Sequence, residues 1–147
     1  FEFLWPLDVQ HTRRTRETND GSCVLRVRGA HHSLLLTGDI EAKTEAALVS
    51  RGLTPVDVAV AAHHGSRTSS SAGFTQAVAP GHVIVQVGRW NRHGHPHAGV
   101  LARWDEAGAR IWRTDWQGGI GVHSRPEGLT MYSVLESSRR YWHGRRP

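Results

Sequence analysis

The sequence predicts a layered α/β fold, because short strand-like runs and helical patterns alternate along most of its length. The strand-like runs are apolar or alternate between apolar and polar residues, whereas the segments between them repeat with helical periodicity. The 147 residues are enough for one compact domain with a substantial core. Cys23 is the only cysteine, which excludes a disulfide framework within the chain and a zinc knuckle built on cysteines.

Strands dominate the first third of the chain. The apolar alternation predicts strands over residues 1–7, 23–27 and 34–37, and a turn at 28–32 joins the second and third into a hairpin. A polar, arginine-rich loop over residues 8–21 separates this hairpin from the first strand.

Helices and strands alternate in the rest of the chain. The expected helices are 41–51, 73–79 and 100–107, and Gly52, Pro80 and Gly108 end them. The expected strands are 56–62, 83–87, 111–113 and 129–134, the last at a sheet edge. The run at 56–62 is apolar almost throughout, as in strands that are buried on both faces. A hairpin turn is expected at 116–120, and the basic tail over 136–147 carries few core-forming residues.

The positive charge of the chain comes almost entirely from arginine. Lys and Arg number 18 against 13 Asp and Glu, which gives a formal net charge of +5, and Lys43 is the only lysine. The guanidinium group matches the geometry of phosphate, so this charge favours a nucleic acid or another polyanion as partner. An arginine-rich composition with a solvated basic surface explains the same charge equally well.

Two strand ends carry the side chains with the clearest chemical potential. The run Leu34–Asp39 delivers a carboxylate through a glycine turn, and the run Val58–Ser66 delivers two imidazoles at His63 and His64. Carboxylates and imidazoles that arrive from neighbouring strand ends are the components of a metal site. The alternatives are that Asp39 caps the helix that begins near Glu41 and that the histidines are a surface pair.

Several motifs together resemble one family. They are Asn19-Asp20-Gly21-Ser22, the runs 34–39 and 56–66, Asn91-Arg92-His93-Gly94-His95-Pro96, Arg113-Thr114-Asp115 and Gly118-Gly119-Ile120. This combination resembles the metallo-β-lactamase-like domain at the C-terminus of ComEC-type DNA internalisation proteins. The resemblance covers residues 1–122, and it implies the second half of an αββα sandwich followed by a basic extension over 123–147.

The resemblance implies two divalent metal ions, Mn2+ or Zn2+. Asp39 would bridge them, His64 is the preferred imidazole ligand, and His63 would be either the ligand or a substrate contact. Asn19 lies where relatives carry a ligand, and an amide oxygen there would favour manganese over zinc. The main ligand motif of the fold, His-x-His-x-Asp-His, is absent from these residues. We therefore expect it to precede Phe1 in a longer polypeptide, and we expect this chain alone to be inactive.

Two loops supply the expected contacts to substrate. Ser66, Arg67, Thr68 and Ser69 offer hydroxyl donors and a guanidinium beside the metals, or else they form a serine loop that caps the next helix. Arg89, Trp90 and Asn91 combine charge with an aromatic ring, as grooves for single-stranded nucleic acid do, unless Trp90 packs beneath its loop. His95 would contact phosphate or act as general acid, with Arg67 and His63 beside it in the catalytic set, and its alternative is a structural bond.

The function that the resemblance implies is a metal-dependent nuclease or phosphodiesterase that degrades the DNA strand not imported during natural transformation. The alternatives are a non-catalytic module that guides DNA into an uptake channel, and a metallohydrolase of a small phosphodiester or lactone. The implied partners are single-stranded DNA and the remainder of the same polypeptide, which comprises the first half of the domain and a transmembrane channel region. The parent protein would reside in the bacterial plasma membrane, with this domain outside the bilayer core.

Overall fold

The fold was analysed in a computed structural model that describes residues 1–7 and 19–138. A six-stranded sheet in the order β1-β2-β3-β4-β5-β6 forms its centre, and β7 and β8 form a separate two-stranded sheet. The strands are β1 (Glu2–Trp5), β2 (Val24–Arg28), β3 (Ser33–Leu36), β4 (Val58–Val60), β5 (His82–Val85), β6 (Arg110–Arg113), β7 (Ile120–Arg125) and β8 (Gly128–Ser133). The helices are α2 (Ala42–Ser50), α3 (Ala72–Val78), α4 (Ala98–Glu106), α5 (Thr114–Gln117) and α6 (Val134–Ser137), with short 3-10 helices η1 (Asn19–Gly21) and η2 (Ala62–Gly65).

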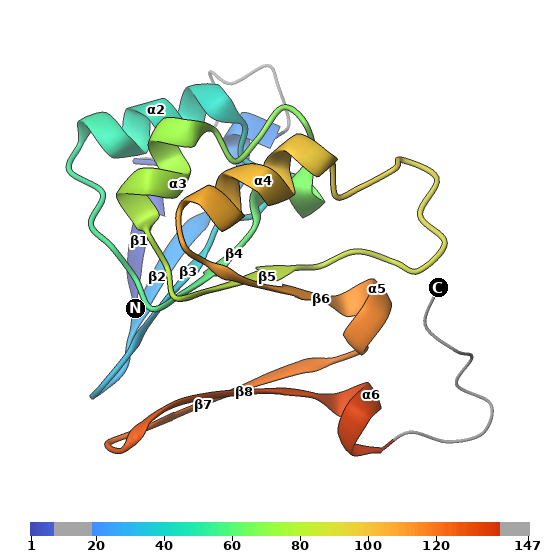
Figure 1. Ribbon diagram of the computed structural model, residues 1–147. Helices are drawn as coiled ribbons and strands as arrows, with labels where there is room; N and C mark the ends of the chain where they lie inside the picture. Colours follow the sequence, from blue (N-terminus) through green and yellow to red (C-terminus); the bar gives the residue numbers. More distant parts are fainter. Residues whose placement is uncertain (8–18, 139–147) are drawn as a thin grey trace.

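The central sheet is mixed. β1, β2 and β3 pair antiparallel, whereas β3, β4, β5 and β6 run parallel to one another. Helices α2, α3 and α4 connect the parallel strands and all lie on the same side of the sheet (Figure 1). This arrangement confirms the layered α/β fold, and it brings the carboxyl ends of the parallel strands to one edge of the sheet.

The main core lies between the sheet and the three helices. Leu35 in β3 and Val83 in β5 are fully buried, and they belong to the same apolar cluster as Phe74 of α3 and Trp104 of α4. The rings of Phe74 and Trp104 meet edge to face with centroids 6.3 Å apart. This packing holds α3 and α4 on the sheet, and both helices flank the loops that follow β4 and β5.

The opposite face of the sheet is covered in part by the β7–β8 hairpin (Figure 1). Val58, Ile84 and Trp112 point to this face because side chains alternate along each strand. The hairpin packs Ile120, Leu129 and Met131 against them. The sheet therefore has helices on one face and a small second sheet on the other.

Two expectations for the last third of the chain were wrong. The hairpin turn expected at 116–120 is absent, because residues 114–117 form α5 and the chain reverses between β7 and β8. The strand expected over 129–134 exists as β8, but it pairs with β7 and not with the edge of the central sheet. The side chain of Gln117 accepts a hydrogen bond from the Arg113 amide at 2.7 Å, which closes the short helix.

Other expectations were confirmed with shifted boundaries. The hairpin around residues 28–32 is present, and the strand expected over 56–62 is confined to β4. Of the loop expected over 8–21, residues 19–21 form η1 and residues 8–18 lie outside the described residues, as do residues 139–147 of the tail expected over 136–147. The division of the chain after residue 122 stays a prediction. In the described parts of the chain, no helix has the length and apolar character that crossing a membrane requires.

Candidate functional site

Asp39 and His64 meet at the carboxyl edge of the central sheet. Asp39 follows β3, and His64 follows β4, which is the parallel neighbour of β3. The Oδ1 atom of Asp39 lies 3.7 Å from Nε2 of His64, and about half of each side chain is exposed. The two strand ends therefore place one carboxylate and one imidazole together, facing solvent.

The ring of His64 is held from its other side. Its Nδ1 atom lies 2.8 Å from the carbonyl oxygen of Gln86, the residue after β5. When Nδ1 carries the proton and donates it to this carbonyl, the lone pair of Nε2 is directed to the Asp39 side. Metal-binding histidines in proteins are commonly oriented in this way.

An unusual backbone conformation turns His63 and His64 in different directions. Both residues lie in the left-handed region, with φ of 48° and 55°. The ring of His64 faces Gln86, whereas Nδ1 of His63 lies 3.3 Å from Oε1 of Glu41. Residues other than glycine rarely adopt this conformation, and such strain concentrates at functional sites.

Contacts on both sides hold this pair of histidines in place. The amide of His63 donates to the carbonyl of Gly38 at 3.0 Å, which ties the end of β4 to the end of β3. Gly65 has φ of 77°, and a Cβ atom there would lie 2.7 Å from Cβ of Pro96. The close approach of Pro96 brings the loop that contains His95 against the strand end.

Glu41 is a residue of this site that the sequence analysis missed as a ligand or contact. Its Oε1 atom accepts hydrogen bonds from Nδ2 of Asn19 at 3.2 Å and from Oγ1 of Thr68 at 2.9 Å. Together with the His63 contact, these bonds gather three of the predicted site residues around one carboxylate. Its position two residues after Asp39, directly before α2, is the signal that could have identified it.

The donor atoms of Asp39 and His64 fit part of a divalent metal site. An oxygen and a nitrogen donor at one solvent-facing edge suit zinc or manganese. Within residues 1–7 and 19–138, however, no group of three or more His, Cys, Asp or Glu side chains is arranged to hold an ion. Further ligands would have to come from other residues, and Asn19 contacts this edge through Glu41.

A pocket of about 320 Å³ opens beside His64, and His93 and His95 also line it. The ring centroids of His95 and His63 are 6.0 Å apart, and those of His95 and His93 are 5.8 Å apart. Burial, and then repulsion from the neighbouring histidines whenever they are protonated, lowers the pKa of His95. His95 is therefore neutral at neutral pH, able to donate a hydrogen bond but seldom carrying an extra proton.

The side chain of Asn91 closes the loop that carries His95. Its Oδ1 atom accepts from the His95 amide and its Nδ2 atom donates to the His95 carbonyl, each at 2.9 Å. Asn91 thus shapes the loop through two backbone bonds. Trp90 beside it does not pack beneath the loop, because 89% of it is exposed. The guanidinium carbon of Arg89 lies 5.5 Å from the centre of the Trp90 ring.

The serine loop after β4 is held by the charged side chains of Glu45 and Arg103. The carboxylate of Glu45, which is fully buried in α2, accepts hydrogen bonds from the amides of Ser70 and Ser71. Burial raises the pKa of Glu45 despite these bonds and the nearby guanidinium of Arg103. Arg103 donates to the carbonyls of Ser69 and Ser70. The loop is thereby fixed against α2 and α4.

The predicted contacts in this loop divide into two groups. Ser69 is buried, and its hydroxyl donates to the carbonyls of Ala62 and Ser66. Ser66 is also largely buried, with its hydroxyl 3.1 Å from that of Thr68. Arg67 and Thr68 are exposed at the tip of the loop. These two side chains are the ones that a ligand at the Asp39–His64 edge could contact.

Comparison with known proteins relates the chain to bacterial competence proteins. No protein-family model matches it. It is 39% identical over 122 residues to Competence protein ComA of Neisseria gonorrhoeae, a match covering 82% of the chain and 17% of that protein. It is 37% identical over 123 residues to Recombination protein 2 of Haemophilus influenzae, covering 84% of the chain and 15% of the relative. ComE operon protein 3 of Bacillus subtilis is 35% identical over 105 residues, or 69% of the chain and 13% of that protein.

The chain matches a segment of the ComEC-type competence proteins. This confirms the family resemblance drawn from the sequence motifs. The ComEC-type segment spans less than a fifth of the length of these relatives. The assignment to one half of a metallo-β-lactamase sandwich stays a prediction.

Proposed function

We propose that the chain serves DNA uptake as one part of a longer ComEC-type protein, and that the intact domain hydrolyses phosphodiester bonds of the strand that is not imported. The names of its relatives support a role in competence. The observation that carries the hydrolytic proposal is the pairing of Asp39 Oδ1 with Nε2 of His64, whose Nδ1 faces a backbone carbonyl. We also propose that the parent protein resides in the bacterial plasma membrane, as the family resemblance implies.

In this proposal, Asp39 and His64 hold divalent cations together with residues outside the chain. Such cations supply positive charge that polarises a phosphate and makes water more acidic. Arg67 and Thr68 bind and orient the phosphate from the tip of the serine loop, since both are exposed there. His95 donates a hydrogen bond to a phosphate oxygen from a ring N–H, since its ring lies between those of His63 and His93 beside the pocket.

The hydrolytic proposal is tested by the variants Asp39→Asn and His64→Asn in a longer polypeptide that contains this chain. Cleavage of single-stranded DNA in the presence of Mn2+ should fall by about 100-fold or more, because Asp39→Asn removes the negative charge of one ligand and His64→Asn removes the imidazole. Binding of Mn2+ measured by calorimetry should weaken in parallel. Asp105→Asn is the matched control, because this exposed carboxylate lies on α4 and should have no effect. Unchanged cleavage by the Asp39 variant would refute the proposal.

A non-catalytic DNA-guiding module is the second candidate, and the exposure of Trp90 favours it. The exposed ring of Trp90, beside Arg89, is suited to stacking on a base of a single strand. Trp90→Ala should weaken binding of a single-stranded oligonucleotide by about tenfold in either function. If this variant loses binding while Asp39→Asn changes neither cleavage nor metal affinity, the guiding function is favoured over hydrolysis.

A further inference from the structure

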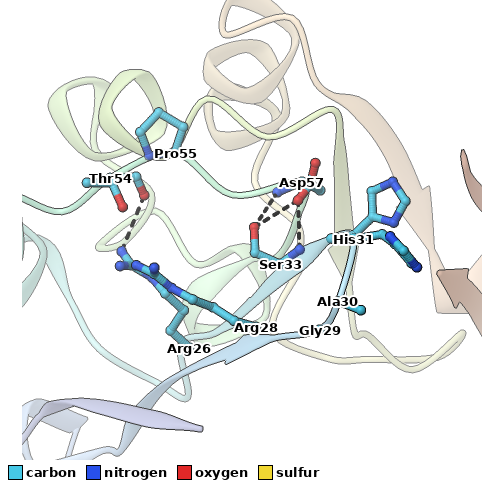
Figure 2. Close-up of a pocket in the computed structure, with 10 residues that line it drawn as sticks. Arg26, Arg28, Gly29, Ala30, His31, Ser33, Thr54, Pro55 and Asp57 are labelled. Carbon is cyan, nitrogen blue, oxygen red and sulfur yellow. Dashed lines mark hydrogen bonds between the residues drawn. The ribbon is translucent and has the colours of Figure 1, made fainter. Parts of the chain in front are cut away.

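A second pocket lies at the amino edge of the sheet, at the opposite ends of the parallel strands from Asp39 and His64. It measures about 300 Å³ and is lined by Arg26, Arg28, the turn at 29–32, Ser33, Thr54, Pro55 and Asp57 (Figure 2). Ser33 begins β3, and Asp57 immediately precedes β4. The pocket therefore shares no residue with the site described above.

Two arginines from β2 line this pocket, against one carboxylate, Asp57, in the same lining. Arg26 and Arg28 are two residues apart in the strand and so point to the same face of the sheet. Figure 2 shows both side chains running from β2 toward Thr54. One oxygen of Glu2 lies 3.7 Å from Arg26 and 4.0 Å from Arg28, so the two guanidinium groups share a single carboxylate.

The guanidinium of Arg26 is buried, but its N–H donors make few good hydrogen bonds. Only 5% of Arg26 is exposed, and its Nε atom is buried without a hydrogen-bond partner. Its bond to the carbonyl of Thr54 is long, at 3.4 Å (Figure 2). Burying unpaired donors of a charged group is costly, so a ligand with several acceptor oxygens would stabilise this arrangement.

The acidic residue of the pocket already has other partners. Oδ2 of Asp57 accepts hydrogen bonds from the amide and the hydroxyl of Ser33, at 2.7 and 2.8 Å. Burial raises the pKa of Asp57, but these bonds and the neighbouring His32 outweigh it and lower the pKa below its ordinary value. This carboxylate therefore secures the start of β3 against β4 and leaves the two arginines with Glu2.

We propose that this pocket binds a phosphate group, with Arg28 and Arg26 as its principal ligands. A phosphate oxygen pair matches the forked donors of a guanidinium, and Arg28 offers such a fork at the pocket mouth because 63% of its side chain is exposed. The phosphate belongs either to a nucleic acid backbone or to a small free anion, and both present the same oxygens to the arginines.

The test uses the 147-residue chain titrated with inorganic phosphate, with thymidine 5′-monophosphate and with a short single-stranded oligonucleotide. Saturable binding is expected, with amide NMR shifts that centre on residues 28–33. Arg28→Gln should weaken binding about tenfold or more, because it removes charge-assisted hydrogen bonds. Lys43→Gln is the matched control, since it removes one positive charge from the first turn of α2, where Lys43 pairs with Asp20 outside the pocket lining, and it should leave the affinity unchanged.

Arg26→Lys provides a second variant, because it keeps the charge and removes the fork. Weaker binding by this variant supports the proposal. If the Arg26 variant fails to fold, weaker binding by Arg28→Gln supports it alone. Preference for the oligonucleotide over inorganic phosphate identifies a nucleic acid as the source, and the reverse identifies a free anion. No saturable binding, or equal losses in Arg28→Gln and Lys43→Gln, overturns it. Asp39→Asn should bind phosphate here normally, so failure of the hydrolytic proposal is distinguishable.

Discussion

Gly65 determines whether the two histidines before it can keep their contacts. Its φ of 77° and the Pro96 side chain 2.7 Å from where a Cβ would lie both require glycine. Gly65→Ala should therefore lower the free energy of unfolding by about 2 kcal/mol or more, since left-handed strain and a steric clash add together. Urea unfolding followed by tryptophan fluorescence measures this change.

Gly52→Ala is the matched control for this substitution. Gly52 has a similar φ of 82°, but nothing lies within 4 Å of a Cβ at that position. Its variant should lose only the strain of the left-handed backbone, about 1 kcal/mol. Equal losses in the two variants would show that Pro96 moves aside without cost.

At the scale of elements, the β7–β8 hairpin is expected to stabilise the face of the sheet that lacks helices. Leu129 in β8 packs with Val58, Ile84 and Trp112. Leu129→Ala should reduce the free energy of unfolding by about 2 kcal/mol, because it removes part of this apolar contact. Thr130→Ala, on the exposed side of the same strand, should change it by less than about 0.5 kcal/mol. A neutral Leu129 variant would mean that the hairpin is dispensable for stability.

Elements with a clear apolar period could be predicted from the sequence. The helix expected at 41–51 and the strand expected at 83–87 correspond to α2 and β5, because long-range packing agrees with the local pattern there. The helix α5 could not be predicted, because four residues carry no period. It depends on Gln117 and on Thr114, whose hydroxyl bridges the amide and carbonyl of Val87.

For the candidate sites too, the sequence predicts what local patterns determine but not what distant segments bring together. Asp39 and His64 could be paired from sequence because both follow apolar strands, and parallel neighbours end at a common edge. For Glu41, the only local signal is its position two residues after Asp39, because its partners Asn19 and Thr68 approach it from distant parts of the chain. The phosphate pocket likewise requires β2 and the loop before β4 to meet, which no local pattern indicates.

For the whole molecule, the net charge of +5 leads to an expectation about salt. The logarithm of the association constant for single-stranded DNA should fall linearly with the logarithm of the salt concentration. The slope should be about −0.7 for each phosphate contacted. Fluorescence anisotropy between about 50 and about 200 mM salt measures this slope. Trp90→Ala should weaken binding without changing the slope, because stacking releases no counterions. A slope near zero would exclude backbone phosphates as the main contact.

The two successive left-handed residues after β4 restrict which amino acids can occupy those positions. Glycine adopts that backbone most readily, and asparagine, aspartate and histidine are the other residues enriched there, whereas a β-branched residue is strongly disfavoured. Glycine or asparagine would therefore serve folding at least as well as the imidazoles of His63 and His64. A library randomised at these positions and selected only for solubility should become enriched in asparagine and glycine. If selection for transformation retains histidine at both positions, the imidazole rings are required for function and not for folding.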